Sequence, residues 1–90
     1  MYQILIVEDD KTLARQVKLA LEKYGYVCKT AEDFQNIDQA VIQTKPDIIL
    51  LDINLPRFDG FYWCRKIRSI SKTPILILSA RNESYDQVRG

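Results

Sequence analysis

Acidic side chains stand directly after two apolar runs of this 90-residue chain. Glu8 and Asp9 follow the run ILIV, and Asp52 follows the run IILL. Ser79 ends a third run, PILIL. Closely packed carboxylates repel one another, and a hard cation such as Mg²⁺ relieves that repulsion through oxygen ligands. A carboxylate can also act as a nucleophile toward phosphorus. If the fold gathers these four residues, they could bind Mg²⁺ and accept a phosphoryl group.

The composition narrows the kinds of chemistry that are available. The chain has no histidine, which removes His-based acid–base catalysis and the commonest transition-metal ligand. Its two cysteines, without a secretory signal, indicate free thiols in a reducing compartment. A net charge of +1 gives no sign of nucleic-acid or membrane attraction, and no apolar run is long enough to span a bilayer. We therefore expect a cytoplasmic protein without a membrane segment.

Short apolar runs alternate with amphipathic stretches along the whole chain. Strands are expected over residues 2–7, 26–30, 48–53 and 74–79, and helices over 11–24, 34–44 and 60–70, with another helix beginning near residue 81. Such alternation predicts an α/β fold, a doubly wound parallel sheet with helices on both faces. Active groups of these sheets lie at the carboxyl ends of the strands. The acidic residues and Ser79 should therefore meet at one edge of the sheet.

Helical spacing predicts which side chains face the sheet. The expected core-facing residues, in chain order, are Leu13, Val17, Ala20 and Tyr24, then Phe34, Ile37, Val41 and Thr44, then Trp63, Ile67 and Ile70. Gly25 is placed to stop the first helix, and Pro46 disfavours a helical conformation at the residue before it. Cys64 is also expected in the core, whereas Tyr62 is expected to point outward.

Three segments of the chain resemble the signature segments of bacterial response-regulator receiver domains. They are ILIVEDD, IILLDINLPRFDG and PILILSAR, and they occur in the family's order and spacing. The similarity covers essentially all 90 residues and implies a flavodoxin-like receiver fold with strand order 2-1-3-4 in this chain. It also implies a Mg²⁺-dependent phosphoacceptor that receives its phosphoryl group from a sensor histidine kinase.

The resemblance assigns roles residue by residue. Asp52 matches the phosphoacceptor and a metal ligand, and Asp9 matches a direct Mg²⁺ ligand. Glu8 matches the acid that binds the metal through water, and Asn54 matches the residue that contributes its backbone carbonyl. Ser79 matches the hydroxyl that senses the phosphoryl group. The resemblance implies a regulatory domain and no enzyme, with self-catalysed phosphoryl transfer and slow autodephosphorylation at most.

Surface residues and the ends of the chain lead to expectations about partners. Thr12, Arg15, Leu19 and Glu22 lie off the predicted core stripe, and the resemblance makes this face the kinase-docking surface. Tyr62 is expected to add to the partner surface. The stretch LPRFDGFYWCRK resembles regulators of the peptide-antibiotic and cell-envelope stress response, which carry a winged-helix DNA-binding domain after the receiver.

Receiver domains of this family continue through a fifth strand, which carries a lysine and a switch aromatic, and a fifth helix. We therefore expect residues 1–90 to be a receiver domain that is incomplete at its C-terminus, with the DNA-binding domain downstream. Without the fifth strand, the fourth strand would be an exposed apolar edge, and such edges recruit other strands. Self-association through this edge is the expected consequence.

Two other readings compete with the phosphorylation switch. A phosphatase with an aspartyl nucleophile often has a second Asp two residues after the first, but Asn54 occupies that position here. A receiver-like interaction module that is not phosphorylated would be expected to lack part of the acidic triad, yet all three acids are present. Taken singly, the acidic cluster could be helix N-terminal charge and Ser79 a helix cap. The phosphorylation switch is the interpretation that the combined pattern favours.

Overall fold

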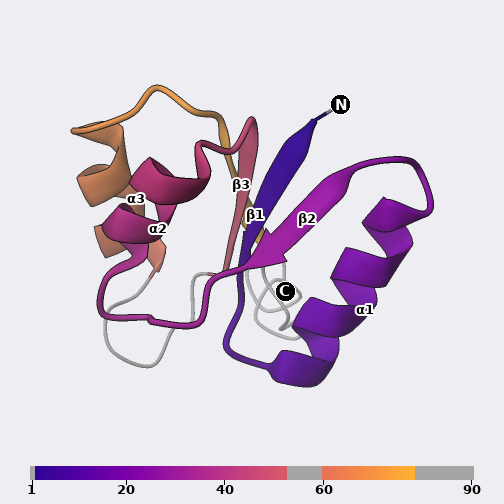
Figure 1. Cartoon of the computed structure of the whole chain (residues 1–90). Helices are drawn as coiled ribbons and strands as arrows, with labels where there is room; N and C mark the ends of the chain where they lie inside the picture. Colours follow the sequence, from indigo (N-terminus) through magenta and orange to yellow (C-terminus); the bar gives the residue numbers. More distant parts are fainter. Residues whose placement is uncertain (1, 53–59, 79–90) are drawn as a thin grey trace, which may run out of the picture.

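Four parallel strands form one sheet in the order β2-β1-β3-β4 (Figure 1). The computed structural model describes residues 2–52 and 60–78. The strands are β1 (Gln3–Val7), β2 (Val27–Thr30), β3 (Ile48–Asp52) and β4 (Ile75–Leu78), and the helices are α1 (Lys11–Glu22), α2 (Ile37–Thr44) and α3 (Gly60–Arg68). The predicted α/β class and strand order are confirmed. The helix expected from residue 81 lies outside the described residues.

The helices cover both faces of the sheet, with α1 on one face and α2 and α3 on the other (Figure 1). This arrangement follows from the alternation of side chains along each strand. In β1, Leu5 and Val7 face α2 and α3, whereas Ile4 and Ile6 face α1. Both sets are apolar and buried, so β1 is a nearly continuous apolar run, as expected for a strand covered on both faces.

Two apolar clusters result, one on each face. The α2/α3 cluster contains Leu5, Val7, Ala31, Ile37, Val41, Ile49, Leu51, Trp63 and Ile67. The α1 cluster contains Ile4, Ile6, Ala14, Cys28 and Leu50, with Val17, Leu21 and Ile48 packed against it and only partly buried. Both cysteines are free thiols, as predicted.

Helix α1 packs on the sheet through a stripe that only partly matches the prediction, because Val17 is shared but Ala14 and Leu21 replace the other members. Ala14, Val17 and Leu21 face the α1 cluster, whereas Ala20 and Tyr24 are exposed. The helix ends at Glu22, so Tyr24 no longer follows the helical rotation. Gly25, with a φ of 91°, turns the chain toward β2, as its position predicted. The stripe that includes the small Ala14 lets the helix approach the sheet closely.

Helix α3 ends earlier than predicted. Trp63 and Ile67 are buried in the α2/α3 cluster, but the helix stops at Arg68 and Ile70 is exposed. The Arg68 guanidinium donates hydrogen bonds to the carbonyls of Ser71 (2.9 Å) and Thr73 (2.6 Å). These bonds hold the connection to β4 in a turn, which removes Ile70 from the helical stripe.

Helix α2 begins at Ile37, so the predicted Phe34 lies before the helix, although it still packs against the α2/α3 cluster. Its end agrees with the prediction from Pro46. Lys45 adopts a left-handed conformation (φ 48°), and its N–H donates to the Val41 carbonyl at 3.0 Å. The chain then enters β3, which ends at Asp52.

Two hydrogen bonds join the chain entering β3 to the start of β1. The Asp47 N–H donates to the Gln3 carbonyl at 2.7 Å, and the Gln3 N–H donates to Asp47 Oδ2 at 2.8 Å. Further along the pair, Val7 lies opposite Leu51. The residues that follow, Glu8 and Asp52, therefore lie side by side at the carboxyl ends of the two strands.

Candidate functional site

Three carboxylates meet at the carboxyl ends of β1 and β3. One oxygen each from Glu8, Asp9 and Asp52 lies within 4.8 Å of the other two. Glu8 and Asp52 are buried, with 5% and 3% of their surfaces exposed, whereas Asp9 is exposed. Three carboxylate oxygens at this separation are a donor set suited to a hard divalent cation. The structure thus brings together the three acids that the sequence singled out.

The three consecutive acids at the end of β1 have different surroundings. Asp10 is the N-cap of α1, and its Oδ1 accepts a hydrogen bond from the Leu13 N–H at 3.1 Å. The Asp10 N–H in turn donates to Glu8 Oε2 at 3.1 Å. This capping turn directs Asp10 to the helix and leaves Glu8 and Asp9 at the sheet edge.

The surroundings of Glu8 disfavour the charged form of its carboxyl group. Burial, together with the nearby Asp52 and Asp9 carboxylates, raises the pKa of Glu8 to about 7, although the hydrogen bond from the Asp10 N–H acts in the opposite direction. Its Oε1 atom is buried and has no hydrogen-bond partner. A buried acceptor of this kind is costly unless a proton or a cation satisfies it.

Not every predicted site residue can be placed. Asn54 and Ser79 lie outside the described residues, although Leu78, the residue before Ser79, lies opposite Asp52 in the sheet. Thr12, Arg15 and Leu19 are exposed on α1, in agreement with the predicted outward face.

Tyr62 differs from its predicted orientation. It is half-buried, packs against the α2/α3 cluster and makes an edge-on ring contact with Trp63, with 5.1 Å between ring centroids. Tyr62 therefore contributes more to packing than the prediction assumed. Cys64 is also half-buried and packs against the same cluster, as expected.

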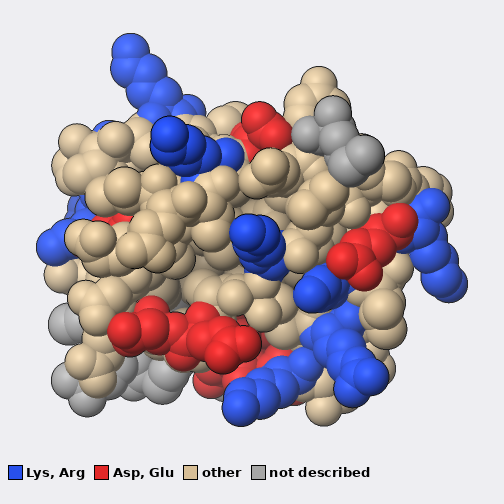
Figure 2. All heavy atoms as spheres, viewed as in Figure 1, with Lys and Arg blue, Asp and Glu red and all other residues tan. Residues whose placement is uncertain are grey.

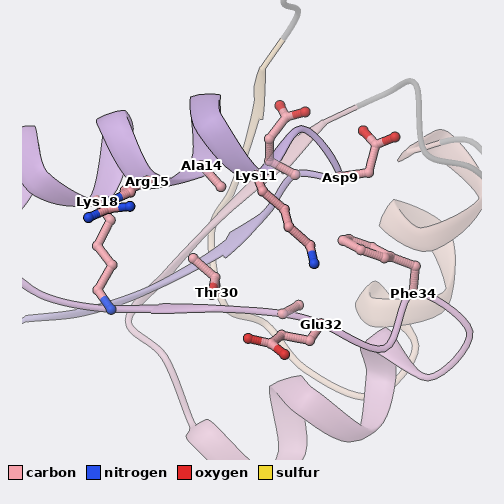
Figure 3. A pocket seen from close by; sticks show the side chains of 10 residues that line it. Asp9, Lys11, Ala14, Arg15, Lys18, Thr30, Glu32 and Phe34 are labelled. Carbon is pink, nitrogen blue, oxygen red and sulfur yellow. The ribbon is translucent and has the colours of Figure 1, made fainter.

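A groove of about 420 Å³ adjoins the carboxylates, between α1 and the end of β2 (Figure 3). It is lined by Glu8, Asp9, Lys11, Ala14, Arg15, Lys18, Thr30, Ala31, Glu32 and Phe34. Figure 2 shows acidic side chains gathered along one edge of the molecule with basic side chains beside them. This groove was not predicted from the sequence. Lys11, Arg15 and Lys18 have an i, i+4, i+7 spacing that can be read from the sequence. The residues that lie across the groove from them depend on the order of the strands.

None of the helices in the described part of the chain has the length and apolar character needed to cross a membrane.

Comparison with known proteins places the chain in a family. The family model of the response regulator receiver domain matches residues 4–90. The transcriptional regulatory protein YvcP of Bacillus subtilis is 53% identical over 88 residues, and the response regulator protein GraR of Staphylococcus haemolyticus is 45% identical over 86 residues. These alignments cover 98% and 96% of this chain but only 37% and 38% of the two relatives.

A solved structure agrees with the sequence relatives. The N-terminal domain of the nisin resistance regulator NsrR, a lantibiotic response regulator, superposes with a TM-score of 0.82 at 37% identity. The superposition covers 99% of this chain and 75% of that chain. The chain therefore belongs to the response regulator receiver domain family, a family of regulatory domains.

Proposed function

We propose that this domain is a cytoplasmic phosphorylation switch, in which Asp52 accepts a phosphoryl group in the presence of Mg²⁺. The observation that carries the proposal is the buried Asp52 carboxylate, gathered with Glu8 and Asp9 within 4.8 Å at the edge of a receiver sheet. The absence of histidine is no obstacle, because phosphoryl transfer requires positioning and charge neutralisation more than acid–base groups.

The residues present suit a magnesium ion. A divalent cation would offset the repulsion that raises the pKa of Glu8, and it would answer the unpartnered Oε1 atom directly or through water. Asp9 and Asp52 would be direct ligands and Glu8 a water-mediated one, with the Asn54 backbone carbonyl completing the protein ligands. When bound, the ion supplies positive charge against the carboxylates and the incoming phosphoryl oxygens.

The reaction itself is a nucleophilic substitution at phosphorus. An Asp52 carboxylate oxygen forms a bond to phosphorus, while the bond from phosphorus to the donor breaks and its electron pair leaves with the donor. The product is an acyl phosphate on Asp52. The Ser79 hydroxyl would donate a hydrogen bond to the added phosphoryl oxygens. A loop that differs between the phosphorylated and unphosphorylated states would carry the signal.

The donor would be a sensor histidine kinase that docks on the outer face of α1. Thr12, Arg15 and Leu19 are exposed there, and α1 starts directly beside the acidic cluster. Kinase docking on this face would bring a phosphorylated histidine close to Asp52. Substituting Leu19 with Asp should abolish transfer from the kinase while labelling by a small phosphodonor is retained.

The output would be control of transcription through a DNA-binding domain. This chain spans less than two fifths of its curated relatives, which are named as transcriptional or response regulators. The solved relative regulates nisin resistance, so a response to peptide antibiotics or cell-envelope stress is the proposed biological role. Residues 1–90 would be the incomplete receiver portion of such a regulator, and its β4 edge would support self-association.

The test is the intact mass of the protein after incubation with Mg²⁺ and phosphoramidate. We expect one added phosphoryl group, lost in Asp52→Asn and lost when Mg²⁺ is removed. Asp47→Asn is the matched control, because Asp47 precedes the opposite end of the same strand and should leave labelling unchanged. No addition under any condition would favour the second candidate, an interaction module that is not phosphorylated.

A further inference from the structure

The groove beside the acidic cluster has one basic wall and one mixed wall (Figure 3). Lys11, Arg15 and Lys18 lie one helical turn apart along the first two-thirds of α1. Thr30 and Glu32 lie across the groove at the end of β2, and Lys11 extends toward that wall in Figure 3. The basic wall is continuous with Glu8 and Asp9. The groove therefore places three cations next to the proposed phosphorylation site.

Within residues 2–52 and 60–78, these three cations are not paired with carboxylates. No ion pair joins Lys11, Arg15 or Lys18 to an acid in this part of the chain, although Glu32 lines the same groove. An alternative explanation is that the three cations only neutralise the acids that line the same groove. That explanation would predict direct pairing with Glu8, Asp9 or Glu32, which the described residues do not make.

The order of charges along α1 also opposes the usual preference of a helix. Cations stabilise the last turn of a helix and acids the first turn, because of the helix dipole. Here the first turn begins with Lys11 and has no acidic residue, while the last turn has no basic residue and ends at Glu22. Local rules of this kind are most often broken where function requires it.

We propose that this groove binds small phosphate-bearing molecules through Lys11, Arg15 and Lys18, and thereby admits small anionic phosphodonors to the site beside Asp52. The part concerning phosphodonors rests on the proposed function. The volume of the groove, about 420 Å³, is in the range of small-ligand sites. The three cations offset the repulsion that the acidic cluster exerts on an approaching anion, and they raise its local concentration. Glu32 acts against binding from the opposite wall.

The first measurement is the binding of pyrophosphate, without Mg²⁺, to the Asp52→Asn protein, followed by amide shifts in NMR spectra. This background allows no phosphorylation, so the result does not depend on the proposed function. Each of Lys11→Gln, Arg15→Gln and Lys18→Gln should weaken binding by about two- to fivefold, the usual range for one exposed charge pair. Glu32→Gln should strengthen binding by a similar factor, and Lys11→Arg should retain it.

Lys72→Gln is the matched control, since Lys72 is exposed like Lys11 and Arg15 but lies before β4, outside the groove. It should leave pyrophosphate binding unchanged. Equal weakening by Lys72→Gln would mean that only net charge matters and would overturn the proposal, as would the absence of any pyrophosphate binding.

The second measurement separates free phosphate compounds from phosphodonors. With Mg²⁺ and an acyl phosphate, the three-fold variant with Lys11, Arg15 and Lys18 all changed to Gln should need a higher donor concentration for half-maximal labelling of Asp52. Its maximal rate should be unchanged. An unchanged donor requirement, with pyrophosphate binding lost, would overturn the role in donor entry. No labelling of Asp52 even in the unsubstituted protein would instead count against the proposed function.

Discussion

On the face of the sheet covered by α2 and α3, the core side chains of β1, β3 and the two helices are almost fully enclosed, whereas Ile77 of β4 is more exposed, at 37%. Trp63 is the largest of them and is 2% exposed, while Ile37 and Ile67 are inaccessible. On the face covered by α1, the buried side chains are fewer, and Leu21 is only partly buried. Leu76 of β4 lies opposite Leu50 on this face and is 58% exposed.

The difference follows from how much helix covers each face. Among the described residues, one helix lies over β1 and β2 on the α1 side, whereas two helices pack together on the other side. In the described part of the chain, the α1 face also has a groove of about 460 Å³, lined mainly by apolar residues such as Leu21, Tyr26 and Leu76. One face therefore stabilises the sheet, and the other keeps surface available for contacts.

The largest expected effect is the truncation of Trp63 on the closed face. Trp63→Ala should lower the free energy of unfolding by about 3–5 kcal/mol, because it leaves a large cavity among well-packed side chains. Urea denaturation followed by circular dichroism measures this loss. A loss of less than 1 kcal/mol would contradict the description of this face as the stabilising one.

A second prediction concerns Glu8, at the edge where both faces end. Its folded-state pKa of about 7 exceeds the ordinary value of 4.5, so the native protein binds more protons than the unfolded chain between these values. Stability should therefore fall as pH rises from 4.5 through 7. Compared with Glu8→Gln, the free energy of unfolding of the unsubstituted protein should fall by up to about 3 kcal/mol across this pH window.

The measurement is urea denaturation of both proteins at pH 4.5 and pH 8. Mg²⁺ added at pH 8 should recover part of the lost stability, since a cation replaces the proton. Glu32→Gln, at an exposed acid, keeps Glu8 and is the control, so it should lose stability across this window as the unsubstituted protein does. An equal stability difference between the protein and Glu8→Gln at both pH values would refute the prediction.

A smaller effect is expected for Leu21 on the more open face. Leu21→Ala removes a half-buried side chain at the rim of the α1 cluster, so the free energy of unfolding should fall by about 1–2 kcal/mol. The same denaturation experiment measures it. If Leu21→Ala costs as much as Trp63→Ala, the two faces do not differ in the way described above.

The smallest change in monomer stability is expected for Leu76→Lys in the edge strand. Leu76 is exposed, so the substitution should alter the free energy of unfolding by less than about 0.5 kcal/mol. It should nevertheless reduce self-association, because charge in an edge strand opposes pairing with another strand. Sedimentation equilibrium at several concentrations measures the change. Leu19→Lys, on α1 at similar exposure, is the control, and equal association of all three proteins would refute a role for β4.

Much of this architecture could be predicted because strand patterns are strong. The run from Ile4 to Val7 is apolar on both faces, and the alternation of strands and helices leaves few possible topologies. The same topology rule located Glu8, Asp9 and Asp52 at one edge. Family resemblance then supplied the proposed role of each acid, which composition and spacing could not.

The parts that were wrong depend on tertiary packing. Tyr24 and Ile70 continue apolar patterns in the sequence, but the helices end before them, at Glu22 and Arg68. The carbonyls that hold Arg68 come from a loop that no periodicity describes. Likewise, the burial of Glu8 and its unpartnered oxygen result from neighbouring elements, so the sequence could not predict its raised pKa.

The pair of hydrogen bonds between Gln3 and Asp47 has a consequence at the far end of the same two strands. Sliding one strand along the other would separate their terminal side chains, but a slip of one residue would turn every buried side chain of the strand to the wrong face. The Gln3–Asp47 bonds and the two apolar clusters therefore oppose any such slip. A shift in strand register therefore cannot relieve the repulsion among the acids. A cation that binds there spends little free energy on arranging its ligands, because folding has already placed them, and preorganisation of this kind raises affinity without adding a contact.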